Sequence, residues 1–149
     1  MSIGSHADRP RPRVFPLAET RPRANNPLAR SSRIVTPATS GSQRLFAGVF
    51  WSDPGAAGGW AFMVDDPLEG TVVDGIPHLG EHDEVYLCLA GRARVEWDEG
   101  SFEFGADDVV FFPAGYTYRS TVLGDEPLRV FYVMSPAPAW MTPLEGNVP

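Results

Sequence analysis

The sequence predicts an all-β domain, closed as a sandwich or barrel, that follows an extended N-terminal segment. From Gln43 onward, short apolar runs are separated by glycine- or proline-bearing turns at intervals of roughly 8 to 12 residues. No stretch shows a sustained apolar period of about 3.6 residues, so no long amphipathic helix is expected. An apolar fraction of 43% in 149 residues is enough for one hydrophobic core.

The N-terminal segment, residues 1–42, is predicted to be an arm, and residues 43–149 are predicted to be the barrel domain. The arm contains RPRPR and TRPRANNP, and its prolines remove amide donors and fix φ, which favours extended backbone. Residues 1–44 carry eight arginines against two acids, or +6, whereas the remainder carries four arginines against seventeen acids, or −13. A positive arm lying across an acidic body, its own or a neighbour's, is one expectation; a partly ordered tail is the other.

The body contains nine candidate strands, each bounded by turn residues. They lie at 43–51, 58–66, 69–73, 82–90, 92–97, 101–104, 107–113, 116–122 and 127–134. The intervening segments DPGAAGG, DEG, PAG and GDEP contain the residues that tight turns favour. Many short strands without helices are typical of a β-sandwich or barrel.

Composition excludes several classes of function. All twelve basic residues are arginine, so lysine-based Schiff-base chemistry is absent. The acidic body offers little attraction to phosphate backbones, so no nucleic-acid partner is expected. Cys88 is the single cysteine and no long apolar run is present, which favours a cytoplasmic protein without an intrachain disulfide or a membrane span.

A histidine- and acid-rich stretch, HLGEHDEVYLCLAG at 78–91, precedes one of the apolar strands. Glu84 is followed after six residues by Gly91, and this spacing resembles the end of the first sequence motif of the cupin superfamily. His78 falls at the first histidine position of that motif, whereas Gly80 stands where a second histidine is expected. A further histidine, at 82, lies two residues beyond the usual pattern.

The segment DDVVFFPAGYTY is similar to the second cupin motif. Pro113 and Gly115 match it, whereas Asp107 replaces its first glycine, Tyr118 its histidine and Val122 its asparagine. The resemblance implies a cupin double-stranded β-helix, that is, a jelly-roll barrel, with an inward-facing Glu84. These departures make it more specific for the fold than for a metal.

Side chains of a strand alternate between faces, so residues 78, 82 and 84 share one side if the segment is extended. Two imidazoles and a carboxylate, from His78, His82 and Glu84, form a ligand set that divalent iron, zinc, nickel or manganese accepts. Tyr118 is then a fourth ligand, a general acid or a hydrogen-bond donor. In the alternative interpretation, both histidines are solvated and only Glu84 is inside, where Tyr118, Tyr86 or an amine-bearing ligand balances it.

The resulting hypothesis is a small-molecule enzyme whose site lies inside the barrel and depends on a divalent metal. Tyr118, Tyr86 and Glu84 are its candidate catalytic residues, and Trp60, Phe62 and Tyr118 are its candidate pocket wall, for which ordinary core packing is the alternative. Lyase, isomerase, cyclase or oxygenase chemistry on an organic acid, phenolic or polyketide-like substrate is compatible with such a site. The alternative function is a metal-free cupin that binds or senses a small molecule without catalysis.

The opposite face of the strand at 82–90 carries Val85, Leu87 and Leu89. Three such residues exposed to water form an unusual apolar patch, so a neighbouring subunit or the arm is expected to cover them. A homodimer is the favoured explanation, since the resembling family commonly forms one.

Overall fold

The computed structural model of the chain describes residues 9–55, 57–58, 72–73, 76–77, 82–116 and 118–137, with only the backbone given at 23–26, 57–58, 72–73 and 76–77. Within these ranges, two segments are helical: a 3-10 turn, η2 (Leu17–Glu19), and α1 (Pro37–Ser40). The strands are β1 (Arg23–Asn26), β2 (Ala29–Val35), β3 (Phe46–Ser52), β4 (Ala57–Gly58), β5 (Val72–Val73), β6 (Ile76–Pro77), β7 (Asp83–Ala90), β8 (Arg92–Trp97), β9 (Gly100–Gly105), β10 (Val109–Phe112), β11 (Arg119–Leu123) and β12 (Leu128–Ser135). Within the described ranges, neither helix is long or apolar enough to cross a membrane.

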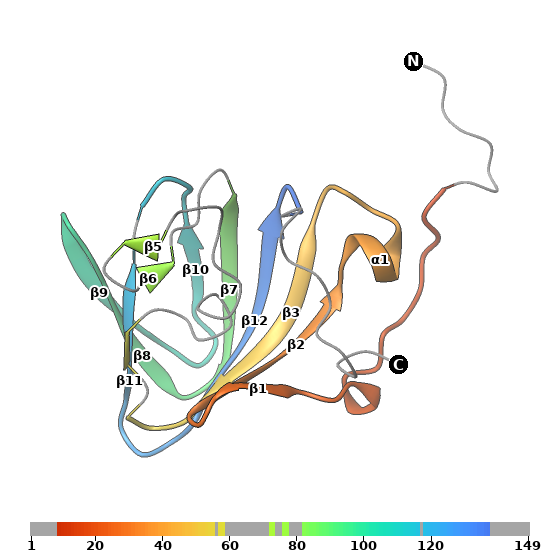
Figure 1. The fold of residues 1–149 in the computed structure, drawn as a ribbon. Coiled ribbons are helices and arrows are strands. Elements are labelled where there is room, and N and C mark those ends of the chain that lie inside the picture. Colours follow the sequence, from red (N-terminus) through yellow and green to blue (C-terminus); the bar gives the residue numbers. More distant parts are fainter. Residues whose placement is uncertain are drawn as a thin grey trace.

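The prediction of an all-β jelly-roll fold is confirmed. A six-stranded antiparallel sheet has the order β1-β2-β3-β12-β7-β10, and a four-stranded sheet has the order β4-β11-β8-β9. Figure 1 shows the two sheets facing each other like the halves of a barrel. The six predicted strands from 82–90 onward, together with 43–51, correspond to observed strands with small shifts at their ends, whereas 58–66 falls almost wholly outside the described residues.

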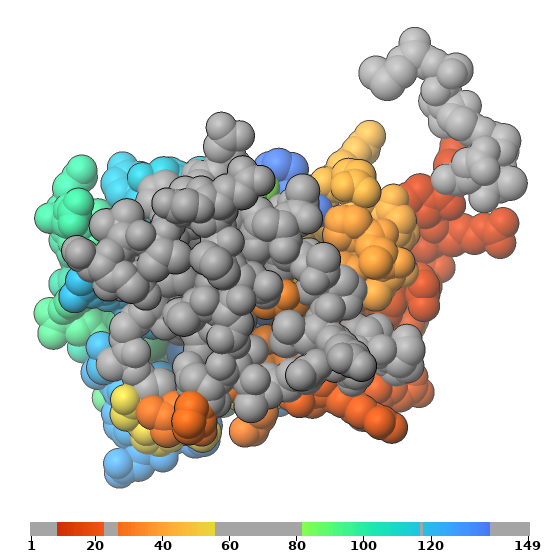
Figure 2. Space-filling model, in the orientation of Figure 1, coloured from red at the N-terminus to blue at the C-terminus, as the bar shows by residue number. Residues whose placement is uncertain are grey.

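The N-terminal segment differs from the predicted arm, because part of it belongs to the large sheet. β2 pairs with β3 over residues 29–35, and β1 pairs with β2. Ser31, Ser32 and Arg33 are fully buried there, which the polar composition of this segment did not indicate. Pro27 and Pro37 bracket the strand without interrupting its hydrogen bonds, so the prolines are compatible with it. Figure 2 shows the earlier N-terminal residues, in red, at the end of the molecule opposite the green β8–β9 hairpin.

The turn between β7 and β8 holds the two sheets together at one end. Gly91 has φ of +81°, and a Cβ there would lie 2.6 Å from the Pro127 carbonyl oxygen. Only glycine adopts this backbone without steric cost. The chain therefore passes from the six-stranded to the four-stranded sheet through a single residue, and β7 enters the barrel with the alternation that its sequence predicts.

Candidate functional site

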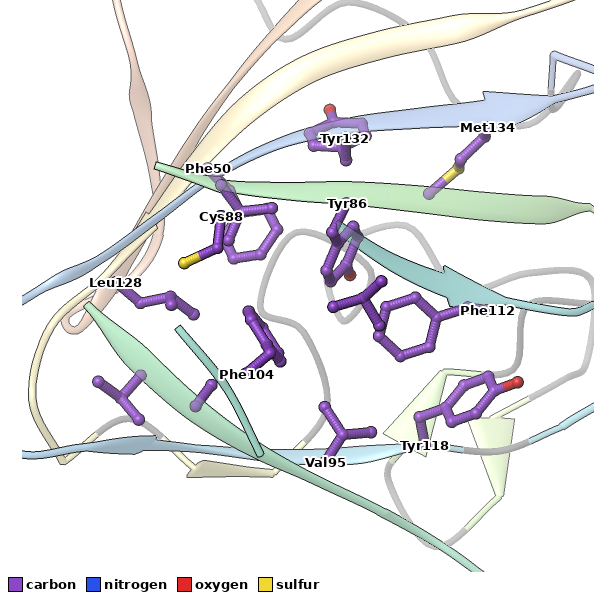
Figure 3. Close-up of a cluster of buried hydrophobic side chains, with 14 of the residues drawn as sticks. Phe50, Tyr86, Cys88, Val95, Phe104, Phe112, Tyr118, Leu128, Tyr132 and Met134 are labelled. Carbon is purple, nitrogen blue, oxygen red and sulfur yellow. The ribbon is translucent and has the colours of Figure 1, made fainter. Parts of the chain in front are cut away.

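Glu84 lies on the inner face of β7 and is fully buried, as the resemblance implied. Buried and exposed side chains alternate strictly along β7, so Tyr86 and Cys88 also face inward. The register places Glu84 between Met134 of β12 and Phe112 of β10. Figure 3 shows the inward side chains of this region converging between the sheets, with Tyr86 and Phe112 in contact. The carboxyl group therefore sits among aromatic and thioether groups in place of water.

Among the residues that the structure describes, neither carboxylate oxygen of Glu84 has a hydrogen-bond partner of normal geometry. Burial raises the pKa of this group from 4.5 to about 8, and the nearby hydroxyl of Tyr86 opposes that rise. Burial is the larger of the two effects, so the net shift of the Glu84 pKa is upward. A carboxyl group with such a pKa exchanges its proton near neutral pH, which is the range in which a general acid or base is most effective.

A row of four residues crosses the inner face next to Glu84, each opposite the next on its neighbouring strand: Arg33 of β2, Gly48 of β3, Tyr132 of β12 and Tyr86 of β7. Gly48 leaves room above the sheet, because a Cβ there would meet the Tyr132 hydroxyl at 2.6 Å. Burial raises the pKa of Tyr132, the positive charge of Arg33 opposes this rise, and the charge of Glu84 adds to it. Tyr132 therefore lies electrostatically between a buried cation and a buried carboxyl group.

Tyr118 also faces the interior and is 7% exposed. Its ring packs edge to face on Phe112 at a centroid distance of 4.9 Å, and its hydroxyl donates to the Pro113 carbonyl oxygen at 2.9 Å. Burial raises the pKa of Tyr118 to about 12, with smaller contributions from Tyr116 and Glu84. Because the backbone takes its proton, Tyr118 offers a ligand only the lone pairs of its oxygen.

His82 precedes β7 and lies within 2.8 Å, through Nδ1, of the Pro136 carbonyl oxygen. A carbonyl only accepts, so Nδ1 carries the proton and Nε2 keeps its lone pair when the ring is neutral. This is the tautomer that metal-ligating histidines commonly use. His82 and Glu84 are thus suitable donors, yet no group of three potential ligands occurs among the described residues. A metal site here needs a further donor.

Three of the predicted site residues lie outside the described residues: His78, Trp60 and Phe62. The others divide into two groups. Glu84, Tyr86 and Tyr118 are brought together in the interior, where Phe112 contacts both tyrosine rings. His82 is half-buried and hydrogen-bonded near the end of β12.

Sequence reasoning missed Arg33 and Tyr132, the two further polar groups of this interior. Arg33 was assigned to the arm, because ARSSRIV has no clear apolar alternation. Tyr132 lay in a predicted strand, and its alternation with Val130 and Met134 was a signal for an inward position. The gap left by Gly48, which admits the Tyr132 ring, follows only from the pairing of β3 with β12.

Comparisons with known proteins agree with this architecture. Residues 68–134 match the sequence model of the family described as "Cupin domain". Among solved structures, KdgF from Halomonas sp. is 18% identical with a TM-score of 0.62, covering 85% of this chain and 96% of that one. A predicted oxalate decarboxylase from Thermotoga maritima is 14% identical with a TM-score of 0.63, covering 83% and 98%.

A putative ethanolamine utilization protein Q from Salmonella typhimurium is 23% identical with a TM-score of 0.52, covering 74% of this chain and 71% of that one. No curated protein matches. At these identities the solved structures share the fold, and nothing more is transferred from them.

Proposed function

Since this chain belongs to the cupin superfamily, we propose that it is a small-molecule enzyme whose site surrounds Glu84 inside the barrel. The superfamily includes metal-dependent enzymes and members without catalysis, so the choice depends on the residues of this chain. Proton transfer is the chemistry that these residues support best, as in an isomerase, a lyase or a cyclase. The proposed substrate is an organic acid, phenol or polyketide-like molecule that matches an aromatic interior.

The observation that carries this proposal is a buried carboxyl group whose two oxygens lack hydrogen bonds of normal geometry to the described part of the chain. A group left in this condition costs free energy in the folded protein, so a function that uses it is favoured over a purely structural role. With a pKa of about 8, Glu84 is largely protonated at neutral pH and can donate a proton to a bound substrate. Tyr86 lies beside it to orient or relay that proton.

A divalent ion is the second part of the proposal. Glu84 and His82 would hold it through a carboxylate oxygen and Nε2, and His78 would supply the third donor. Iron, zinc, nickel or manganese accepts such a set. When bound, the ion polarises a substrate oxygen as a Lewis acid, and with iron oxygenase chemistry also becomes accessible. The donation from His82 to Pro136 supports this role, because it fixes the ring in the required tautomer.

A metal-free binding or sensing module is the competing function, and one observation favours it. Burial alone is sufficient to keep Glu84 protonated at neutral pH, so no cation is needed to balance it. A neutral carboxyl group offers one donor and one acceptor, and Tyr118 offers a further acceptor, so the same residues suit recognition of an amine or hydroxyl group. Such a module would bind its ligand and leave it unchanged.

The decisive experiment is metal analysis of untagged protein, followed by a ligand screen with small organic acids and phenols. The enzyme proposal expects turnover of a bound compound, followed by NMR, that is lost in Glu84→Gln and retained in Glu103→Gln, an exposed control on β9. Stoichiometric metal that disappears in a His82→Ala, Glu84→Gln double variant supports the ion. Binding without turnover in metal-free and metal-supplemented protein alike supports the module.

We also propose that the protein is a cytoplasmic homodimer formed through the outer face of the six-stranded sheet. Its outer patch, defined as Val85, Leu87, Leu89, Val109 and Phe131, is 36 to 69% exposed in one chain. Two copies that each carry a net charge of −7 repel one another, and an uncharged patch is where they can approach. The same patch on both copies produces a self-complementary contact about a two-fold axis.

A further inference from the structure

A pocket is lined by residues of the β8–β9 hairpin, of β10 and of the β10–β11 connection. β9 and β10 are the edge strands of their sheets (Figure 1). The volume of the pocket is about 230 Å³, slightly below the range of pockets that hold drug-sized ligands. We call it the edge pocket, and five of its lining residues are aromatic: Trp97, Phe102, Phe111, Tyr116 and Tyr118. Glu84 is not among the lining residues, so this pocket is separate from the interior site although it shares Tyr118.

The aromatic walls come from opposite sides of the opening. Trp97 and Phe102, on the β8–β9 hairpin, lie with ring centroids 5.6 Å apart. Tyr116 and Tyr118, from the β10–β11 connection, lie 6.0 Å apart. Phe111, which is 60% exposed, completes the lining from β10. Rings contributed by three segments around a small hollow can present their faces to one compact group.

Two carboxylates, those of Glu99 and Asp83, lie at the edge pocket. Among the described lining residues, Glu99, in the turn between β8 and β9, is the one with a charged side chain. Asp83 lies close enough to Tyr118 to raise the pKa of its hydroxyl, and it is held beside the pocket by accepting from the Ala114 amide at 3.0 Å. The faces of aromatic rings carry negative charge as well. Anions are therefore disfavoured here, and cations are attracted.

We propose that the edge pocket binds a small organic cation of the quaternary or methylated ammonium type. Aromatic cages recognise such groups through cation–π attraction, and a neighbouring carboxylate adds to it. A bare ammonium group is strongly hydrated and needs several acceptors to replace its water, whereas the described lining offers one carboxylate. A methylated ammonium group is weakly hydrated and presents an apolar surface to the rings. This inference holds whether or not Glu84 is catalytic.

Calorimetric titration with choline, against its uncharged carbon isostere in which a tert-butyl group replaces the trimethylammonium group, tests the proposal. Sodium chloride at matched concentration controls for ionic strength. We expect choline to bind at one site per chain and the isostere to bind at least about tenfold more weakly, as loss of a desolvated cation–π contact predicts. Equal affinity for the two compounds, or no binding of choline at millimolar concentrations, overturns the proposal.

Two variants and their matched controls locate the binding. Trp97→Leu keeps an apolar side chain but removes an aromatic face, and is expected to weaken choline binding at least about fivefold. Glu99→Gln changes an exposed turn residue without risk to the fold and is expected to weaken it about threefold. Trp51→Leu and Glu103→Gln, both outside the pocket, should leave binding unchanged. If the two pocket variants bind choline as the wild type does, the site is not the edge pocket.

Discussion

The polarity of the two faces of β7 is the reverse of what most antiparallel strands show. On the inner face, Glu84 is fully buried, followed by Tyr86 and Cys88. On the outer face, Val85 and Leu87 are 40% and 36% exposed. An antiparallel strand with one solvated face normally turns its apolar residues inward and its polar ones outward. Here an ionisable group is inside and aliphatic groups are outside.

Both departures cost free energy in an isolated chain, and each therefore indicates a use. An inward carboxyl group provides acid–base chemistry that a purely aliphatic core lacks. An outward aliphatic row provides a surface for contact. Phe15 and Leu17 of the N-terminal segment line a groove of about 410 Å³ together with Leu87, Leu89 and Phe131. Val109, on the edge strand β10, is left 69% exposed.

The largest expected effect is on the free energy of unfolding, and it comes from replacing Glu84 on the inner face. Its pKa is raised in the folded protein, so its contribution to stability is fully present below pH 4.5 and is lost as the pH rises through about 8. Glu84→Gln cannot ionise. The wild type should lose up to roughly 5 kcal/mol relative to this variant across that interval, at 1.36 kcal/mol per unit of pKa. Urea unfolding of both proteins as a function of pH measures the difference.

Repeating this measurement with a chelator distinguishes metal-bound from metal-free protein. A divalent ion on Glu84 keeps the carboxylate charged, so in metal-bound protein the relative stability should increase with pH and should change direction once the ion is removed. A relative stability that does not depend on pH, with or without chelator, would contradict the assignment of a raised pKa to Glu84.

A smaller loss is expected from filling the space beside Tyr132. In Gly48→Ala, the added methyl group meets the Ser32 carbonyl oxygen and lies 2.6 Å from the Tyr132 hydroxyl, so strand and ring must both move. Overpacking of this kind costs about 1 to 3 kcal/mol. Gly100→Ala is the control, since its methyl group would meet only the Trp97 ring, at 3.3 Å. Thermal unfolding should show a larger loss of stability for Gly48→Ala than for Gly100→Ala. Equal losses of stability would show that the interior has room for the added methyl group.

The inner–outer contrast was largely predictable from the sequence. Strict alternation in DEVYLCLA, with the six-residue spacing from Glu84 to Gly91, predicted which side chains enter the barrel, and β7 confirms it. The alternation of side chains between the two faces depends only on the strand itself, so the sequence of one strand is enough to predict it. The role of Arg33 was not predictable in this way, because a buried arginine leaves no apolar pattern.

The partners of Glu84 were predictable only in part. Tyr86 follows from alternation on the same strand, whereas Tyr132 reaches the site through the register of β12 against β7. Such pairing joins residues almost fifty positions apart, and spacing along the chain does not encode it. The histidine substitution at position 118 was visible in the motif, but the donation of the tyrosine hydroxyl to Pro113 depends on the conformation of the intervening loop.

A substitution on the outer face of β7's sheet can weaken the proposed subunit contact without changing the inner face. Val109→Asp places a charge in the outer patch at a side chain that is 69% exposed, so the fold of one chain should change little. In the proposed dimer two such charges face an apolar partner, and the dissociation constant should rise at least about tenfold, equivalent to 1.4 kcal/mol. Sedimentation or light scattering as a function of concentration measures it. Val14→Asp, at an 84% exposed position outside the patch, is the control; a wild type that stays monomeric would contradict the dimer.

The smallest effect is expected on the outer face of the four-stranded sheet. Unlike the outer patch, this face carries charged side chains, as a solvated sheet face usually does. There Arg94 pairs with Glu96 at 3.1 Å, and the two side chains are 50% and 52% exposed. Solvent screens such a pair, so Arg94→Ala should change the free energy of unfolding by no more than about 0.5 kcal/mol. It should also leave the oligomeric state unchanged, because a charged, solvated sheet face is a poor contact surface. A monomer produced by Arg94→Ala would instead place the subunit contact on this sheet, and the exposed aliphatic row of β7 would then need another explanation.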